Sequence, residues 1–337
     1  MRGPIGNPEL SAHQTHPQGA SPGVLVVGMA RSGTSASTAL LARLGLALTV
    51  DSDVIPGNVL NPRGVYESRT VRRFDQVLLA RWCEGGWANP CLPAGWDRQP
   101  GVRMLHSAGR RLFESVHPTR PWLCKDPQFC LTLPFWLQAL HPNPAVALTY
   151  RHPVAVARSL QRGMGYELSR GLAIWERHQR SALQALDGQS VAVVNYDELV
   201  AEPAGGAATL AGWLTALGVV LAADAQREAA AVIGEGQRHW HASGEDRRLL
   251  SPEQRDLVDL LDAGRGVHMR WSAPALGRET PTTTARFAAT PIKSLLRRPR
   301  WWWWIAEQTM PETLSGPASR LRAPRRLRQV GSIEVSD

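Results

Sequence analysis

Residues 24–45 predict a buried strand, a tight turn and a helix in immediate succession. The run V-L-V-V at 24–27 is apolar and mostly β-branched, which is typical of a buried strand. Gly28 and Gly33 bound the turn, and the alanine- and leucine-rich sequence from Thr34 onward suits a helix packed on a sheet. The N–H groups and the positive dipole end of such a helix point at one place beyond the strand. The stretch therefore predicts an anion site, for a phosphate or a sulfate.

The turn resembles a nucleotide-phosphate loop but lacks the lysine of that loop. Gly28, Gly33 and Ser35 match the pattern G-x-x-x-x-G-K-[ST], whereas Thr34 stands in the lysine position. The cation of the turn is Arg31, inside the loop. An ordinary NTPase is disfavoured because the clamp on the β- and γ-phosphates of ATP is missing. The loop suits a terminal anion held by backbone amides, hydroxyls and one guanidinium, although a glycine-capped helix without a ligand explains the same residues.

Net charge and its distribution limit the partners. The chain has 337 residues and a formal charge of +9. From Ser272 onward it holds eleven Lys/Arg against five Asp/Glu, so residues 1–271 carry only about +3. Such a charge is modest for a nucleic-acid binder, and no nucleic-acid partner is expected. Lys125 and Lys293 are the only lysines in the sequence, which draws attention to each of them.

Cysteine spacing and the N-terminal sequence predict a cytoplasmic protein. The four cysteines show no C-x-x-C spacing, and no charged region followed by an apolar segment begins the chain. Free thiols in a reducing cytoplasm are therefore expected. The uncharged run from Pro203 to Ala223 is diluted by glycine and alanine, which disfavours a membrane span. A core helix around Leu210, Trp213 and Leu217 is the better interpretation.

Strands and helices are predicted to alternate through the first two hundred residues. Further strands are expected at 122–125, 145–150 and 190–195, with helices at 69–82, 102–116, 133–140, from 153 and at 168–186. This order predicts an α/β fold of three layers, with a mostly parallel central sheet, helices on both faces and ligands at the carboxyl ends of the strands. Residues 1–22 are predicted to be a disordered arm, 23–271 the folded domain, and 272–337 a linker and a basic, tryptophan-rich tail.

Four candidate functional residues lie at or just after the ends of predicted strands. Arg31 lies after the first strand, Lys125 ends the second, Arg151 follows the third and Tyr196 the fourth. Because the carboxyl ends of parallel strands meet at one edge of a sheet, these side chains are expected to converge. Ser159 comes eight residues after Arg151, inside the helix that follows the third strand.

Two motifs in this order resemble those of PAPS-dependent sulfotransferases, in the bacterial branch of that superfamily. The sequence G-M-A-R-S-G-T-S at 28–35 is similar to the loop for the 5′-phosphosulfate, and R-H-P-V-A-V-A-R-S at 151–159 to the motif for the 3′-phosphate. The stretches K-D-P at 125–127 and N-P-R-G-V-Y-E at 61–67 also resemble this branch. The resemblance covers roughly residues 24–200 and implies a P-loop-like sulfotransferase fold.

This resemblance implies PAPS (3′-phosphoadenosine 5′-phosphosulfate) as the sulfuryl donor. The implied ligands of its 5′-phosphosulfate are Arg31, Ser32, Gly33, Thr34 and Ser35; those of its 3′-phosphate are Arg151 and Ser159. Tyr196 would lie near the adenosine or act as a packed aromatic. The implied reaction is in-line transfer of the sulfuryl group to a hydroxyl or amine of a small-molecule, glycan or natural-product acceptor, with adenosine 3′,5′-bisphosphate as the other product. No metal is expected.

Catalytic roles are predicted for Arg31, Lys125 and Glu67. The two cations are candidates for stabilising charge on the bridging oxygen, and Glu67 is the predicted general base. Lys125 is also open to interpretation as a surface lysine, and Glu67 as a solvated or helix-capping residue. Other candidate bases, which stay open, are Asp51, Asp53, His106 and His117.

The acceptor and the role of the tail are not determined by these motifs. Trp82, Trp87 and Trp96 predict either an aromatic pocket or a loop pinned to the core. Cations beside four successive tryptophans suit peripheral membrane contact through residues 291–328. A docked terminal helix or a homodimer contact explains the same composition.

Two other function classes stay open at this point. A P-loop kinase acting on a small metabolite would need an acidic magnesium ligand after a strand, for which Asp126 and Asp197 are the candidates. A non-catalytic anion- or lipid-binding protein would use the basic tail and form no product.

Overall fold

The structure is a computed structural model that describes residues 23–57, 64–83, 86–233 and 244–288. These residues belong to a compact unit whose bounds are Met1–Ser294. The predicted N-terminal arm at 1–22 and the tail at 291–328 lie outside the described residues.

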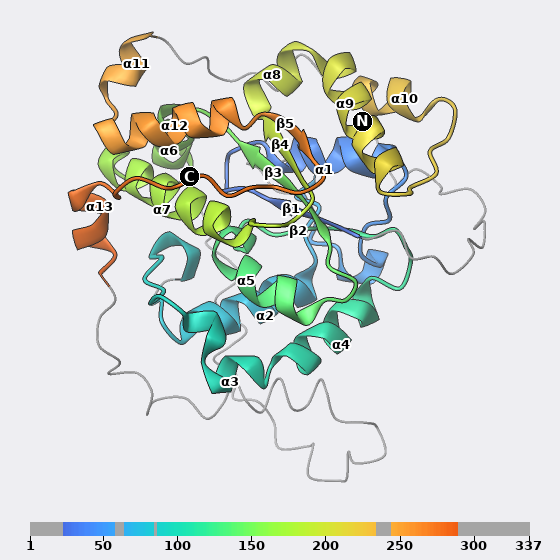
Figure 1. Cartoon of the computed structure of the whole chain (residues 1–337), viewed down its shortest axis with the longest axis horizontal. Helices are drawn as coiled ribbons and strands as arrows, with labels where there is room; N and C mark the ends of the chain where they lie inside the picture. The colour runs from blue at the N-terminus through green and yellow to red at the C-terminus, as the bar shows by residue number, and fades with distance from the viewer. Residues whose placement is uncertain (1–22, 58–63, 84–85, 234–243, 289–337) are drawn as a thin grey trace, which may run out of the picture. The chain divides into compact units, whose positions relative to one another are not determined.

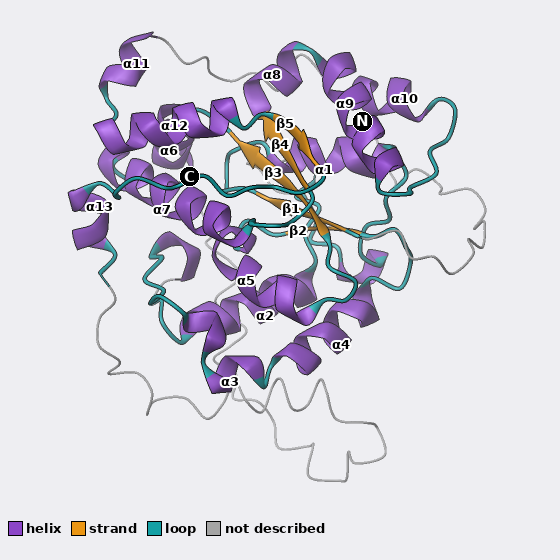
Figure 2. Ribbon diagram, in the orientation of Figure 1, coloured by secondary structure: helices purple, strands orange, loops and turns teal. Residues whose placement is uncertain are grey.

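A five-stranded sheet lies between the helices (Figure 2). The strands are β1 (Val24–Val27), β2 (Leu123–Lys125), β3 (Ala145–Tyr150), β4 (Val191–Asn195) and β5 (Gly266–His268). Their order is β2-β1-β3-β4-β5; β1 to β4 are parallel, and β5 runs antiparallel to β4. Val26 is in register with Lys125, and Tyr150 with Asn195, so the carboxyl ends of the four parallel strands lie along one edge.

Helices cover both faces of the sheet (Figure 1). They are α1 (Thr34–Arg43), α2 (Arg69–Ala80), α3 (Pro100–Arg103), α4 (His106–Val116), α5 (Phe129–Ala139), α6 (Pro153–Met164), α7 (Leu168–Ala185), α8 (Tyr196–Ala201), α9 (Pro203–Ala216), α10 (Ala225–Ala231), α11 (Gly244–Arg248), α12 (Pro252–Ala263) and α13 (Pro281–Arg286). On one face, α1, α8, α9 and α10 share an apolar cluster with Val24 and Val26. On the other face α5 packs on β1, with α2 and α4 below it in Figure 1. The predicted three-layer, mostly parallel fold is confirmed.

The local predictions hold best where the sequence pattern is strong. Pro153 is the first residue of α6, as expected from its fixed φ. The uncharged run forms α9, in which Leu210 and Trp213 are buried, and none of the described helices is long and apolar enough to cross a bilayer. The helix expected at 102–116 is instead two helices, α3 and α4. The short strand β5 was not predicted, because three residues with one apolar side chain leave no periodicity.

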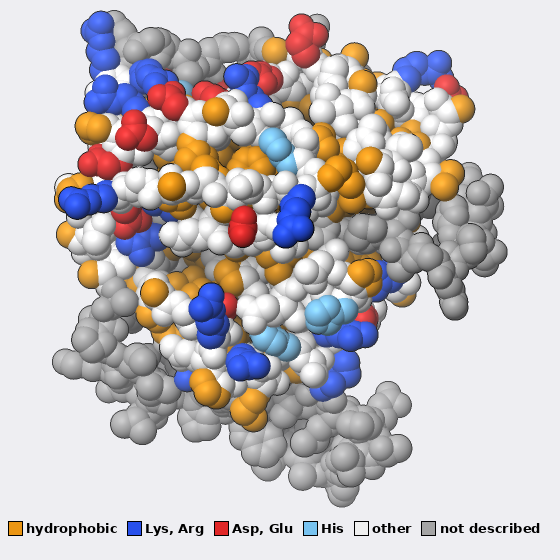
Figure 3. Space-filling view, viewed as in Figure 1, with side chains coloured by type: hydrophobic (Ala, Val, Ile, Leu, Met, Phe, Trp, Pro, Cys, Tyr) orange, Lys and Arg blue, Asp and Glu red, His pale blue; other side chains and the backbone are white. Residues whose placement is uncertain are grey.

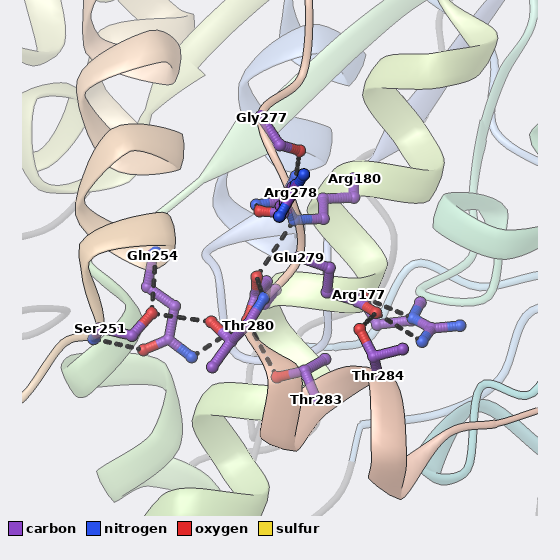
Figure 4. A network of polar contacts seen from close by, with 11 residues as sticks. Arg177, Arg180, Ser251, Gln254, Gly277, Arg278, Glu279, Thr280, Thr283 and Thr284 are labelled. Atoms are coloured by element: carbon purple, nitrogen blue, oxygen red, sulfur yellow. Dashed lines mark hydrogen bonds and ion pairs between the residues drawn. The ribbon is translucent and has the colours of Figure 1, made fainter.

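The stretch after residue 271, predicted to be a linker, is part of the domain. Its attachment centres on Glu176 of α7, a fully buried carboxylate. Figure 4 shows Arg180, Gln254, Thr280 and Thr283, which belong to this network. Arg180 Nε donates to Glu176 at 3.1 Å, and the Thr280 backbone N–H at 2.8 Å. Thr283 and Gln254 also donate to it, at 2.9 and 3.2 Å, so α7, α12 and α13 meet at one satisfied charge.

A second ion pair and an aromatic ring complete this attachment. Arg177 donates to both carboxylate oxygens of Glu279, at 2.6 and 2.7 Å, and its guanidinium lies 5.7 Å from the centre of the Phe287 ring. Phe287 and Trp271 are both buried. Composition predicted a linker here because threonine, alanine and proline are common in linkers, whereas the partners of this segment lie about a hundred positions away in the sequence.

Acidic and basic side chains are interspersed over α11 and α12 on the face drawn in Figure 3. One such exposed pair joins Arg247 to Asp259 at 2.6 Å. Mixed charge of this kind is typical of a domain with a small net charge.

Candidate active site

The turn between β1 and α1 depends on two close backbone approaches. A Cβ atom on Gly28 would lie 2.3 Å from the carbonyl oxygen of Thr149 on β3. Gly33 has a φ of 91°, and a Cβ atom there would lie 1.9 Å from the Tyr196 ring. Arg31, with a φ of 72°, also adopts the left-handed conformation that non-glycine residues rarely use. Only glycine fits at both ends of this turn, which explains the spacing seen in the sequence.

The turn presents hydrogen-bond donors that nothing in the described part of the chain accepts. The backbone N–H groups of Gly33, Thr34 and Ser35 begin α1, and they donate to no described residue. Ser32 is fully buried, and its Oγ has no partner within the same described residues. Buried polar groups normally find partners. Together with the positive end of the helix dipole, these donors are of the kind that bind anions at helix N-termini.

Arg31 joins this turn to the Arg–Ser motif on α6. Its Nε donates to Ser159 Oγ at 2.9 Å. Arg151 lies over the Tyr196 ring at 4.7 Å, and Arg151 Nε donates to Asp197 at 3.2 Å. The structure therefore brings together the residues that follow β1, β3 and β4. Arg31 and Ser159, expected at opposite ends of one nucleotide, are in direct contact.

The electrostatic potential around Arg31 and Arg151 is positive. Burial lowers the pKa of Arg31 from its ordinary value, and the charges of Arg151 and Arg162 act in the same direction. Tyr196 opposes this effect. Guanidinium groups keep their protons at neutral pH, so the positive charges of Arg31 and Arg151 are held close together. Asp197, which pairs with Arg151, lowers their repulsion, and an anion with more than one charge would lower it further.

Glu67 and Lys125 form a buried ion pair at the end of β2. Lys125 Nζ donates to Glu67 Oε1 at 2.5 Å and to the Val65 carbonyl at 3.2 Å. Arg72 Nη1 reaches the other oxygen of Glu67 at 3.2 Å. Glu67 is 5% exposed and Lys125 4%, so neither is a surface residue. The helix-capping role considered for Glu67 is wrong, because Ser68 caps α2 by accepting the Val71 N–H.

The other candidate bases have structural roles or lie elsewhere. Asp53 accepts hydrogen bonds from Thr49, Ser68 and Thr70, and thereby fixes the start of α2 beside Glu67; its shortest contact is with Ser68. His117 stacks on Phe113, and burial lowers its pKa to about 4. His106 packs edge-on against Phe135, and Asp51 is exposed.

Comparison with known proteins identifies the family. A sequence model of the sulfotransferase family matches residues 22–216. The chain belongs to the sulfotransferase family. No curated protein sequence matches this chain.

Solved structures of two sulfotransferases are similar to this sulfotransferase. The sulfotransferase domain of the olefin synthase from Synechococcus is 17% identical, with 82% of this chain and 97% of that domain covered and a TM-score of 0.35. A sulfotransferase from Mycobacterium tuberculosis is also 17% identical, with 73% and 77% covered and a TM-score of 0.38.

The tryptophan-rich loop of this sulfotransferase is held to its own core. Trp96 is buried and packs edge-to-face on Trp82, with 5.4 Å between ring centres. Trp87 lies edge-on to His178 of α7 at 6.3 Å. These contacts agree with a loop pinned by aromatic packing. The described residues therefore do not assign an acceptor to it.

Sequence reasoning missed several residues that surround the Glu67–Lys125 pair. Arg72 contacts Glu67 at 3.2 Å, and Asp75 and Gln128 are buried nearby. These three roles left no signal in the sequence, because they depend on how α2 and α5 pack. Asp197, considered in the sequence only as a magnesium ligand, instead binds Arg151.

Proposed function

We propose that this sulfotransferase moves the sulfuryl group of PAPS to a hydroxyl or amine of a small-molecule, glycan or natural-product acceptor. The observation that carries the proposal is the contact of Arg31 with Ser159, beside Arg151 and beside backbone N–H groups that donate to no described residue. Donors of this kind suit a ligand with anionic groups at two places. Residues after three parallel strands contribute, which is where a sheet of this type binds its ligands.

The residues present fit such a donor. Ser32, Gly33, Thr34 and Ser35 would hold its 5′-phosphosulfate through backbone N–H groups and hydroxyls. Arg151 and Ser159 would hold its 3′-phosphate, with Arg31 between the two. Tyr196, buried against Gly33 and Arg151, would keep both in place beside the nucleoside. When bound, PAPS supplies an activated sulfuryl group whose leaving group is a stable phosphate anion.

The buried ion pair would take up the proton of the acceptor and stabilise the charge on the leaving oxygen. Glu67 would accept the proton of the attacking hydroxyl, and Lys125 would stabilise charge on the bridging oxygen. The two roles are linked because Lys125 Nζ donates to Glu67 at 2.5 Å. A proton on Glu67 removes the charge that holds Lys125, so the lysine becomes available as charge develops on the leaving oxygen.

A magnesium-dependent kinase is a weaker reading of the same site. Asp197 is engaged by Arg151 at 3.2 Å. Asp126 accepts the Gln128 N–H at 2.7 Å, and burial followed by the charge of Glu67 raises its pKa to about 7. A carboxyl that favours its neutral form is a poor magnesium ligand.

Calorimetric titration with adenosine 3′,5′-bisphosphate and with ATP tests the proposal. The bisphosphate is expected to bind at least tenfold more tightly, and Arg151→Ala to weaken it by about 30-fold through loss of a charge-assisted contact. Arg110→Ala is the control, because Arg110 pairs with Glu114 on the exposed side of α4. Equal affinity for ATP, or an unchanged affinity in Arg151→Ala, would contradict the proposal. Transfer of labelled sulfuryl from PAPS to a panel of hydroxyl and amine acceptors then tests the reaction.

A further inference from the structure

Two aspartates lie buried beside the Glu67–Lys125 pair. Asp126 follows Lys125 directly at the end of β2 and is 1% exposed. Asp75, on α2, is fully buried. The charge of Asp126 acts on Asp75, and the charge of Glu67 acts on Asp126. The three carboxyl groups therefore form one electrostatic cluster behind the proposed catalytic lysine.

The hydrogen bonds of this cluster leave acceptors without donors. Asp75 Oδ1 accepts from Trp136 Nε1 at 2.8 Å, and Asp126 Oδ1 from the Gln128 N–H at 2.7 Å. The second oxygen of each aspartate is buried and has no partner among the described residues, and the same is true of Gln128 Oε1. Buried acceptors normally receive a hydrogen bond. A carboxyl group that keeps its proton is a donor that can supply one here.

Charge balance leads to the same conclusion. Among the residues that the structure describes, the cations acting on Asp126 are Lys125 and Arg72, and both contact Glu67. Three ionised carboxylates would leave one buried negative charge without a cation, which is costly. One proton on the aspartates leaves two carboxylates for two cations.

The remaining titratable groups around Asp126 do not change this balance. Burial keeps the thiols of Cys124 on β2 and Cys130 on α5 neutral by raising their pKa values. Burial also raises the pKa of Asp75 well above its ordinary value, and the charge of Asp126 adds to that effect. Arg72 and Lys125 lower the pKa of Asp126, but burial and Glu67 outweigh them.

We propose that Asp126 is a positioning residue that works as a carboxylic acid: one proton, held between Asp126 and Asp75, keeps Lys125 bound to Glu67. The proposal rests on the proposed function, which makes Lys125 and Glu67 the catalytic pair. An ionised Asp126, next to Lys125 in the chain, would compete with Glu67 for the ammonium group. Loss of the proton to solvent therefore draws Lys125 away from the position that the reaction needs.

Infrared difference spectroscopy of the full chain measures the proton directly. Between about pH 5 and about pH 9, wild type should lose the carbonyl-stretch band of a protonated carboxylic acid in a buried site. Asp126→Asn should lack this component of the difference spectrum. Asp259→Asn, which alters an exposed pair on α12, should retain it. A wild-type spectrum without such a band near neutral pH would overturn the inference without any variant.

The pH profile of kcat/KM separates positioning from a merely structural role. Wild-type activity should fall about tenfold as pH rises from about 7 to about 9, following the ionisation of Asp126. Asp126→Asn, which stays neutral, should keep activity within about threefold at pH 6 and show no such fall. An unchanged alkaline fall in Asp126→Asn would overturn the inference. A buried acid detected by infrared in a chain that transfers no sulfuryl group would count against the proposed function instead.

Discussion

Replacing Lys125 with methionine separates the structural and chemical roles of the buried ion pair. Methionine keeps most of the volume of lysine and removes its charge, which leaves Glu67, 5% exposed, with Arg72 as its remaining cation. Breaking a buried pair by removing one partner costs about 3–5 kcal/mol. Because Arg72 still contacts Glu67 at 3.2 Å, we expect the lower end, about 3 kcal/mol. For a domain of this size, that loss lowers Tm by about 6–10 °C.

The double variant Lys125→Met with Glu67→Gln should recover most of this stability. Neither buried charge remains in it, so the free energy of unfolding should lie within about 1.5 kcal/mol of wild type. Sulfuryl transfer should stay at least about 100-fold reduced in both variants, because neither keeps the lysine at the bridging oxygen. Urea unfolding and initial rates, measured on the same preparations, give the two quantities.

The exposed pair Arg110–Glu114 is the matched control. Arg110→Met removes a cation whose side chain is 47% exposed, so the free energy of unfolding should change by less than about 0.5 kcal/mol. A loss below about 1 kcal/mol in Lys125→Met would refute the assignment of a buried pair. Activity restored in the double variant would refute the catalytic role of the lysine while leaving the stability argument intact.

Three further predictions follow from the geometry. Gly33→Ala should abolish binding of adenosine 3′,5′-bisphosphate in calorimetry, since an added Cβ meets the Tyr196 ring and φ is 91°; binding within about threefold of wild type would contradict it. Ending the chain after residue 271 should give a protein that melts at least about 5 °C lower or aggregates, because buried Phe287 and the partners of Glu176 are lost; an unchanged Tm would contradict it. The folded pKa of Asp126, about 7, exceeds its unfolded value, so its stabilising contribution is complete below about pH 4 and is lost as pH rises to about 7. The free energy of unfolding, measured with urea, should therefore fall between these pH values in wild type, and fall less in Asp126→Asn.

The sequence was informative about the site where a residue's position follows from the order of the chain. Arg31, Arg151 and Tyr196 each follow a strand that could be read from apolar runs, and parallel strands end at one edge. The convergence of these three residues was therefore predictable, whereas the contacts of Lys125, at the end of β2, are with Glu67 and Val65. The direct contact between Arg31 and Ser159 was not predictable, because the reach of a side chain across 128 positions depends on the path of α6.

Predictions from composition were wrong where contacts between residues distant in the sequence determine the structure. Residues 272–288 have the composition of a linker, yet Thr280 and Thr283 donate hydrogen bonds to the buried carboxylate of Glu176 on α7, beside Arg180 and Gln254. The role of Glu67 was likewise open in the sequence. Its burial beside Lys125 depends on a loop that returns to β2 from 58 positions earlier.

By itself, the sequence determined the layers of this protein, the direction of its main strands and the glycine-bounded turn between β1 and α1, because each follows from local periodicity and from glycines that no other residue can replace. Tertiary structure alone decided which charges are buried together. Whether Asp126 keeps its proton, and whether Lys125 faces Glu67 or solvent, depends on desolvation and on neighbours brought from α2 and α5. Desolvation is a property of the folded environment, and no spacing of residues along the chain encodes it.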